Sequence, residues 1–173
     1  MILQRIRQFY YAITGQLSSE DRQKITQYLP AEAVSLFDAM HPADQYHAFR
    51  VACTAVVFCD TAADPSIDRE LLIRCSLLHD IGRRKGDMDI WGKVFAVLMM
   101  WWSPRLARRW AAAQHGRFGH ALFIYLAHPS IGAEKLNAIG MKREAEIVSL
   151  HHTSPSQTDC KELCLLRYAD GKN

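Results

Sequence analysis

Helical periodicity runs through nearly the whole chain, and it is the feature that most constrains the fold. Apolar residues recur every three or four positions, strong helix formers fill most windows, and no strand-like alternation bounded by turn pairs occurs. The chain has 173 residues, of which 49% are hydrophobic, and this is enough to bury a core without covalent staples. The sequence therefore predicts a single-domain, all-α helical bundle over residues 1–173.

Capping and breaking residues predict where the helices begin and end. Ser18 resembles a helix N-cap, Gly82 stands where a helix C-terminus favours a left-handed residue, and His128-Pro129-Ser130 is expected to end one helix and start another. The expected helices cover an amphipathic segment at 1–15, then 19–29, 31–40, 43–62, 69–81, two helices divided at Ser103-Pro104, and 119–127, 129–139, 142–152 and 160–170. Ser66 or Asp68 is expected to cap the fifth of these, and Thr158 or Asp159 the last. Residues 1–42 form N-terminal helices in this scheme, and 43–170 form a core with a helical insert at about 87–118.

Composition argues against a disulfide framework and a membrane span. The five cysteines are scattered and form no CxxC pair, so we expect buried free thiols in a reducing cytosol: Cys53, Cys59, Cys75, Cys160 and Cys164. The longest apolar run, 94–102, has nine residues, whereas a spanning helix needs about 20. Arg5 and Arg7 interrupt the first apolar run, which is unlike a signal peptide. The sequence predicts a cytoplasmic protein.

Positive charge is concentrated in one stretch. Residues 83–117 contain eight basic side chains against two acidic ones, a net charge of +6 within a chain of +3, so the remainder carries −3. This excess suits an anionic small molecule, a nucleic acid or a membrane surface, and the simpler interpretation is a solvated helix face. Segment 91–110 also holds all four tryptophans, Trp91, Trp101, Trp102 and Trp110. We expect these aromatics in the core, with a nucleobase-stacking lid, a membrane-surface helix or a dimer interface as alternatives.

Histidine and aspartate recur at the ends of apolar helices. His79-Asp80 follows one such helix, and His151-His152 ends another. Imidazole and carboxylate together suit iron, manganese, zinc and related ions. Adjacent side chains in a helix diverge by about 100°, so they do not ordinarily face one ion, but this restriction loosens at a helix end. A carboxylate can also bridge two metals about 3.5–4 Å apart. Each pair alone is weak evidence, because histidine is also common at helix C-termini for electrostatic reasons.

Taken in order, these stretches resemble the HD-domain metal-dependent phosphohydrolases of the two-metal branch. The matching stretches are HAFRV at 47–51, LLHDIGR at 77–83, HPSIGAE at 128–134, HH at 151–152 and LRYAD at 166–170. The resemblance implies a first metal held by His47, His79, Asp80 and Asp170, and a second held by His128, His151, His152 and the bridging Asp80. His41 is a rival for the first position, although it precedes Pro42, and His115 and His120 match nothing in the motif.

The resemblance also implies an activity. Two divalent ions, with iron or manganese favoured over zinc, magnesium, nickel or cobalt, would generate a metal-bound hydroxide that hydrolyses a phosphoester or phosphoanhydride, most plausibly in a nucleotide. Asp80, Arg83 and Lys85 are the expected catalytic residues, the two cations orienting the phosphate. Thr153-Ser154-Pro155-Ser156 stands where an HD-GYP phosphodiesterase has a carboxylate and its GYP tripeptide, which argues against cyclic di-GMP as substrate.

Two alternatives belong to other classes. A non-catalytic HD module could bind a nucleotide or protein partner and signal, although every expected ligand is retained. The insert at 91–110 could instead make a peripheral membrane contact, which we weigh less. The expected partners are a small phosphorylated substrate and, as an option, a second copy in a homodimer, with no stable nucleic acid partner.

Overall fold

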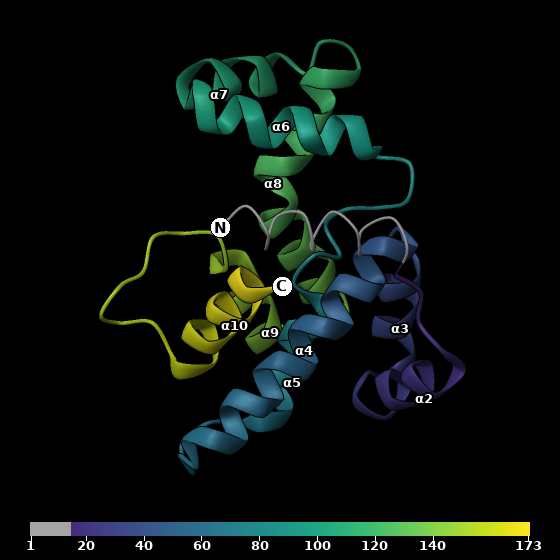
Figure 1. Ribbon diagram of the computed structural model, residues 1–173, viewed down its shortest axis with the longest axis vertical. Coiled ribbons are helices and arrows are strands. Elements are labelled where there is room, and N and C mark those ends of the chain that lie inside the picture. Colours follow the sequence, from purple (N-terminus) through teal and green to yellow (C-terminus); the bar gives the residue numbers. More distant parts are fainter. Residues whose placement is uncertain (1–14) are drawn as a thin grey trace.

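The computed structural model describes residues 15–173, which form nine α-helices and no strand (Figure 1). The helices are α2 (Ser19–Tyr28), α3 (Ala31–Asp38), α4 (Pro42–Ala62), α5 (Arg69–Leu78), α6 (Ile90–Trp102), α7 (Pro104–Ala113), α8 (Gly116–Ala138), α9 (Lys142–Leu150) and α10 (Lys161–Lys172). The predicted all-α fold is confirmed. The amphipathic helix expected at the N-terminus lies almost wholly outside the described residues.

Helix starts follow the predicted capping residues at two of three places. Ser18 accepts a hydrogen bond from the Asp21 amide while the Asp21 carboxylate accepts one from the Ser18 amide, a reciprocal box that opens α2. Asp68 caps α5 by accepting from the Leu71 amide. The prediction for α10 is wrong, because Cys160 occupies the N-cap position without a side-chain hydrogen bond. The Asp159 carboxylate accepts instead from Arg167 and from the Ser156 amide.

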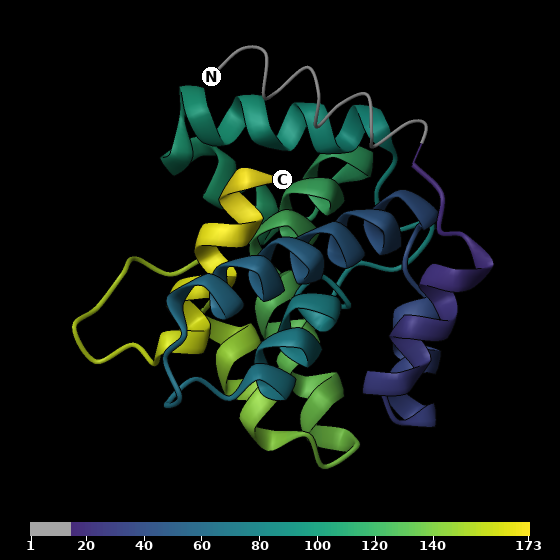
Figure 2. The same ribbon diagram turned by 60° about the horizontal axis from the view of Figure 1, so that its bottom comes forward.

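Helices α4, α5, α9 and α10 pack together as the centre of the bundle, and α2 and α3 cover one side of it (Figures 1 and 2). Their shared core is fully apolar, with Val51, Leu72 and Leu166 completely buried between α4, α5 and α10. Arg74 of α5 donates to Glu144 of α9 at 2.7 Å, so the one nearly buried acid of α9 is neutralised. This packing brings the C-terminal ends of α5 and α9 close to the first third of α4 and to α10.

Helix α8 runs unbroken through Pro129, so the predicted break at His128-Pro129-Ser130 is wrong. A proline within a helix lacks the amide that would bond to the carbonyl four residues earlier, here that of Tyr125. The His128 ring satisfies this carbonyl instead, with Nδ1 at 2.9 Å from the Tyr125 oxygen. Tertiary packing on both sides of the proline keeps the helix continuous, because Leu122 and Leu136 are both fully buried.

Gly82 also departs from its prediction. It does not take a left-handed conformation, which in residues 15–173 is found at Gly86, Gly116 and Gly140 among the glycines. A Cβ on Gly82 would lie 2.0 Å from the carbonyl oxygen of His128. The glycine is therefore required because the backbone of α8 passes directly over it, which places the end of α5 against His128.

Helices α6 and α7 form a separate layer over the first half of α8, at one end of the molecule (Figure 1). Trp110 packs edge-on against Phe95 with ring centroids 5.4 Å apart. Trp91, Trp101 and Trp102 are exposed, so the expected burial of the insert's aromatics is wrong for three of the four. Helix α6 packs onto α7 and α8 through Ala96, Met99 and Phe95, whose ring centroid lies 4.4 Å from that of Phe118. Its three tryptophans lie on the outside.

The cysteine and membrane expectations have mixed outcomes. All five cysteines are free thiols, but only Cys59 and Cys75 are buried, so the expectation of buried thiols is wrong for the other three. No helix within residues 15–173 is both long enough and apolar enough to span a bilayer.

Candidate metal centre

Three helices bring a first group of ligand types together. His47 of α4, His79 just after α5 and Asp170 of α10 each offer one atom, and these atoms lie within 4.8 Å of one another. His47 Nε2 is 3.0 Å from Asp170 Oδ1, and His79 Nε2 is 3.8 Å from the same oxygen. The three side chains come from positions 47, 79 and 170, so only the folded bundle assembles them.

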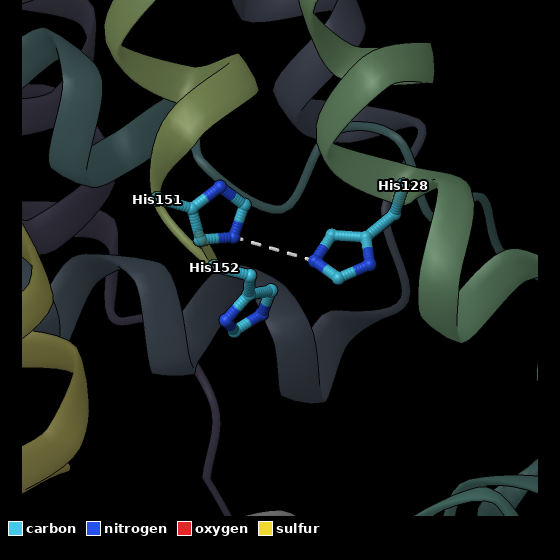
Figure 3. A group of neighbouring side chains, drawn as sticks. All are labelled: His128, His151 and His152. Atoms are coloured by element: carbon cyan, nitrogen blue, oxygen red, sulfur yellow. Dashed lines mark hydrogen bonds between the residues drawn. The ribbon is translucent and has the colours of Figure 1, made fainter. Parts of the chain in front are cut away.

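A second group consists of three imidazoles from two helices (Figure 3). His128 extends from α8, and His151 and His152 follow the end of α9. His128 Nε2 faces His151 Nε2 at 3.3 Å, and the ring of His152 lies 5.0 Å from that of His128 between centroids. His128 and His151 are buried, whereas His152 opens to solvent.

Asp80 lies between the two groups. One carboxylate oxygen is 3.5 Å from His79 Nε2, and the other is 3.3 Å from His128 Nε2. Asp80 is almost completely buried, yet its Oδ1 forms no hydrogen bond. The placement is the one expected for a carboxylate that bridges two cations, and the unpaired oxygen is a buried acceptor in need of a positive partner.

Backbone carbonyls hold three of the histidine rings in one orientation. The Nδ1 atoms of His79, His128 and His151 lie 2.9, 2.9 and 2.6 Å from the carbonyl oxygens three residues earlier. A carbonyl can only accept, so in the neutral ring the proton resides on Nδ1 and the Nε2 lone pair faces the centre. The carbonyls are available because α5 and α9 end there and because Pro129 lacks an amide. Such backing of the far ring nitrogen is typical of metal-binding histidines.

Burial and neighbouring charges move the pKa values of the second group downward. Burial lowers the pKa of His128, helped by the Arg83 cation, and burial together with His79 lowers the pKa of His151 well below its usual range. Burial and His128 lower the pKa of His152 to about 4. These three rings are therefore neutral near pH 7, the protonation state in which imidazole binds metals.

The acidic residues and His47 shift the other way, toward their charged forms. Burial alone would raise the pKa of Asp80, but Arg83 and His79 outweigh it, so the carboxyl is held well below its usual range. Burial opposes ionisation of Asp170 as well, yet the hydrogen bond from His47 lowers its pKa. For His47, burial works against protonation, and the Asp170 bond and the Asp80 charge still raise its pKa. The centre therefore holds two ionised carboxylates, with Arg83 bonded to Asp80 and His47 bonded to Asp170.

This donor set fits divalent cations. The Nε2 lone pairs of His128 and His151 face each other at 3.3 Å and repel. Arg83, 3.1 Å from His128 Nε2, offsets part of this repulsion, and a bound cation would offset more. Two carboxylates with five imidazoles, each of them in reach of an Asp80 or Asp170 oxygen or of another ring, match the mixed nitrogen and oxygen ligation of iron, manganese and zinc. All seven side chains that the sequence pattern singled out as ligands converge here: His47, His79, Asp80, His128, His151, His152 and Asp170.

A cavity of about 300 Å³ opens beside the first group. It is lined by His47 and Asp170 together with three cations, Arg50, Arg83 and Lys93. Arg83 donates to Asp80 at 2.9 Å, and its other terminal nitrogen lies 3.1 Å from His128 Nε2. An anionic group in this cavity would therefore meet positive charge directly beside the ligand side chains.

The structure separates the two cations that the sequence grouped together. Arg83 lines the cavity, whereas the Lys85 side chain is exposed and does not. Lys93 of α6, which the sequence analysis did not select, reaches the cavity and donates to Asp44 of α4 at 2.5 Å. The sequence shows Lys93 as a single charged residue near the start of an otherwise apolar helix. That pattern does not reveal which helix the lysine contacts.

The remaining histidines lie outside the centre. His41 is the N-cap residue of α4 and accepts from the Ala43 amide through Nδ1. His115 is exposed before α8, and the ring of His120 packs beside Phe123. The structure thus places His47, and not His41, in the first group.

Comparisons with known proteins add no relatives. No family model matches the chain, and no curated protein or solved structure resembles it significantly.

Proposed function

We propose that this chain is a metal-dependent hydrolase that cleaves a phosphoester or phosphoanhydride bond in a small phosphorylated substrate, with nucleotides as the first class to test. The observation that carries the proposal is the convergence of seven ligand side chains around the buried, bridging Asp80, next to a cation-lined cavity. The resemblance of their order to the HD-domain phosphohydrolases supports it, and membership of that superfamily is part of the proposal.

The ligands would hold two divalent ions, with iron or manganese favoured because histidines share a carboxylate. When bound, such a pair lowers the pKa of water and neutralises the charge that develops on phosphoryl oxygens. His47, His79 and Asp170 would hold one ion, and His128, His151 and His152 the other, with Asp80 between them.

The chain's own residues would bind and orient the phosphate. Arg83 presents a planar guanidinium, which binds two phosphate oxygens at once, and the Asp80 carboxylate fixes it at 2.9 Å. Arg50 and Lys93 add positive charge on the other cavity walls. The cavity volume of about 300 Å³ lies at the lower end for ligand pockets, which favours a small molecule over a polymer.

The experiment is metal analysis of the purified full chain, followed by a phosphate-release screen. The screen covers nucleoside mono-, di- and triphosphates, dinucleoside polyphosphates and cyclic dinucleotides, each with iron, manganese or zinc. Asp170→Asn is the matched inactive variant, and Asp38→Asn, on the exposed surface of α3, is the control. We expect bound metal and metal-dependent product with the wild type and the control alone.

Two results would contradict the proposal in different ways. Failure to bind any of the three metals would reject the metal centre itself. Binding of metal and nucleotide without product would favour the non-catalytic signalling module, because such a protein retains the ligands and lacks the reaction.

A further inference from the structure

The outward face of α6 is apolar along its whole length. Trp91, Leu98, Trp101 and Trp102 have exposed fractions of 68%, 57%, 82% and 75%. At about 100° per residue these positions, together with the partly exposed Val94 and Val97, fall on one side of the helix. The opposite side packs on α7 and α8 through Ala96 and Met99. Apart from Lys93, helix α6 is thus apolar, while only about half of its circumference is packed.

This exposed area is large for a soluble helix. With about 150–250 Å² for each indole, the three tryptophans alone expose roughly 340–560 Å². Exposed apolar patches of this size mark contact sites more often than neutral surface. Nothing among residues 15–173 covers it, since all three tryptophans remain solvent-accessible in the packed bundle.

The charge within α6 and α7 has a single sign, and Asp89, the acid that caps the start of α6, is paired with Arg117. From Ile90 to Ala113 the sequence contains no acidic residue, whereas Arg105, Arg108 and Arg109 of α7 are all exposed. Arg105 follows Trp102 after one short turn at Ser103, so the basic residues of α7 come directly after the aromatic end of α6 in the sequence. Tryptophan beside arginine is the combination that favours the boundary between the headgroups and acyl chains of an anionic bilayer.

We propose that α6 and α7 dock this protein on an anionic phospholipid surface. The tryptophans and Leu98 would enter the headgroup boundary, and the α7 arginines would neutralise lipid phosphates. The pair lies at one end of the part of the molecule formed by residues 15–173, where it can approach a flat surface (Figure 1). A second copy is a poorer occupant, because a symmetric contact would bring the arginines of one copy toward those of the other.

The docking face adjoins the candidate centre but does not depend on it. Val97 belongs both to the outward face of α6 and to the lining of the cavity that holds Arg83 and Asp170. Docking would therefore set the cavity beside the lipid surface. The inference stands on exposure and charge alone, so it survives if the proposed hydrolase activity fails, and the reverse also holds.

The test is vesicle co-sedimentation of the full chain. The vesicles are pure phosphatidylcholine or phosphatidylcholine with 30 mol% phosphatidylserine, each at low and at high salt. We expect binding to the anionic vesicles that weakens with salt. Two double variants should each lower the vesicle partition constant about tenfold: Trp101→Ala/Trp102→Ala and Arg108→Gln/Arg109→Gln. Val57→Ser, at an exposed apolar position on α4, and Lys142→Gln, at the start of α9, are the matched controls.

The outcomes separate the alternatives. Equal binding to both vesicle types overturns the proposal. Unchanged binding by the two α6–α7 variants overturns it as well, because another segment of the chain would then bind the lipid. Sedimentation velocity is run in parallel. A dimer that the tryptophan variant abolishes, with no vesicle binding, assigns the face to a second copy instead. Unchanged circular dichroism of each variant excludes unfolding as the cause of a loss.

Discussion

The two ligand groups differ in charge, although both offer three side chains. The first contains the Asp170 carboxylate and lines the cavity, whereas the second is built from imidazoles alone, and none of its members lines that cavity. The second also lies against a permanent cation, since Arg83 contacts His128. A divalent ion is therefore attracted more strongly to the first group, and the second depends on what Asp80 contributes.

The difference implies an order of loading. Neutral imidazoles bind through lone pairs without balancing the charge of the ion, so Asp80 must supply negative charge to both positions. We expect the first group to bind its ion more tightly and the second to be lost first on dialysis against a chelator. Single substitutions at the shared and unshared ligands test this asymmetry.

Asp80→Asn should have the largest effect, because it removes charge from both groups while keeping the side-chain volume. We expect loss of both ions and a fall in activity of at least about a hundredfold, measured by elemental analysis and phosphate release. Asp38→Asn on α3 serves as the control for loss of an acidic charge. Full metal content in Asp80→Asn would refute the bridging position.

Reciprocal substitutions of His47 and His128 should each remove one ion. His128→Gln is expected to empty the second group and spare the first, because its ring contacts Asp80 but not Asp170. His47→Gln should weaken the first group and, if the first ion loads before the second, lower total metal more. Competition with a coloured chelator measures both affinities, and retention of both ions in His128→Gln would exclude it as a ligand.

The sequence could predict which side chains lie together but not the reasons for their placement. The order of the histidine and aspartate motifs singled out all seven side chains that converge, because few residue types can serve as metal ligands. Gly82 and Pro129 were assigned to local backbone roles, a helix end and a helix break. Their actual roles are tertiary: Gly82 admits the backbone of α8, and Pro129 frees the Tyr125 carbonyl that orients His128. Local propensity cannot report contacts between segments 46 residues apart.

The cavity and the insert show the same limit. Lys85 adjoins the histidine-aspartate motif in sequence, yet it points to solvent, while Lys93 reaches Asp44 because α6 crosses near α4. The aromatic run of α6 looked like core because its composition is apolar. Which half of an apolar helix is buried depends on its neighbours, and here Ala96, Met99 and Phe95 face α7 and α8 whereas the three tryptophans of α6 do not.

Arg83→Gln should separate substrate binding from metal binding. Loss of a charge-assisted bond to phosphate should raise KM by roughly tenfold or more. Removal of a cation next to His128 should at the same time tighten the second ion severalfold. Arg84→Gln, at the exposed neighbour, is the control, and an unchanged KM with weaker metal binding would assign Arg83 to support of Asp80 alone.

Substitution of Lys93 or Lys85 should give a smaller effect. The pair tests whether substrate binding depends on lining the cavity or on adjacency to the histidine-aspartate motif in the sequence. Lys93→Gln should raise KM about five- to tenfold, because it removes a charge from the cavity wall. Lys85→Gln should change KM less than about twofold. The opposite ranking would show that the loop after the histidine-aspartate motif, and not α6, contacts the substrate.

Histidine titration of the metal-free protein gives the smallest effect and distinguishes the two ligand groups by the direction of their histidine pKa shifts. By NMR, His152 should titrate near pH 4 and His47 above its usual 6.5, since burial dominates the former and Asp170 stabilises the charged form of the latter.

A depressed pKa means that the unfolded chain binds more protons, so His128, His151 and His152 cost stability as pH falls from about 6.5 toward 4. His47 contributes the opposite slope, with its stabilisation present at low pH and lost as pH rises above 6.5. Because three rings oppose one, the Tm of the metal-free protein should drop by several degrees across that interval, and His152→Gln should flatten the drop. A Tm that rises toward pH 4 would show that the second group carries protons in the folded state, which would contradict the neutral, inward-facing imidazoles on which its metal binding depends.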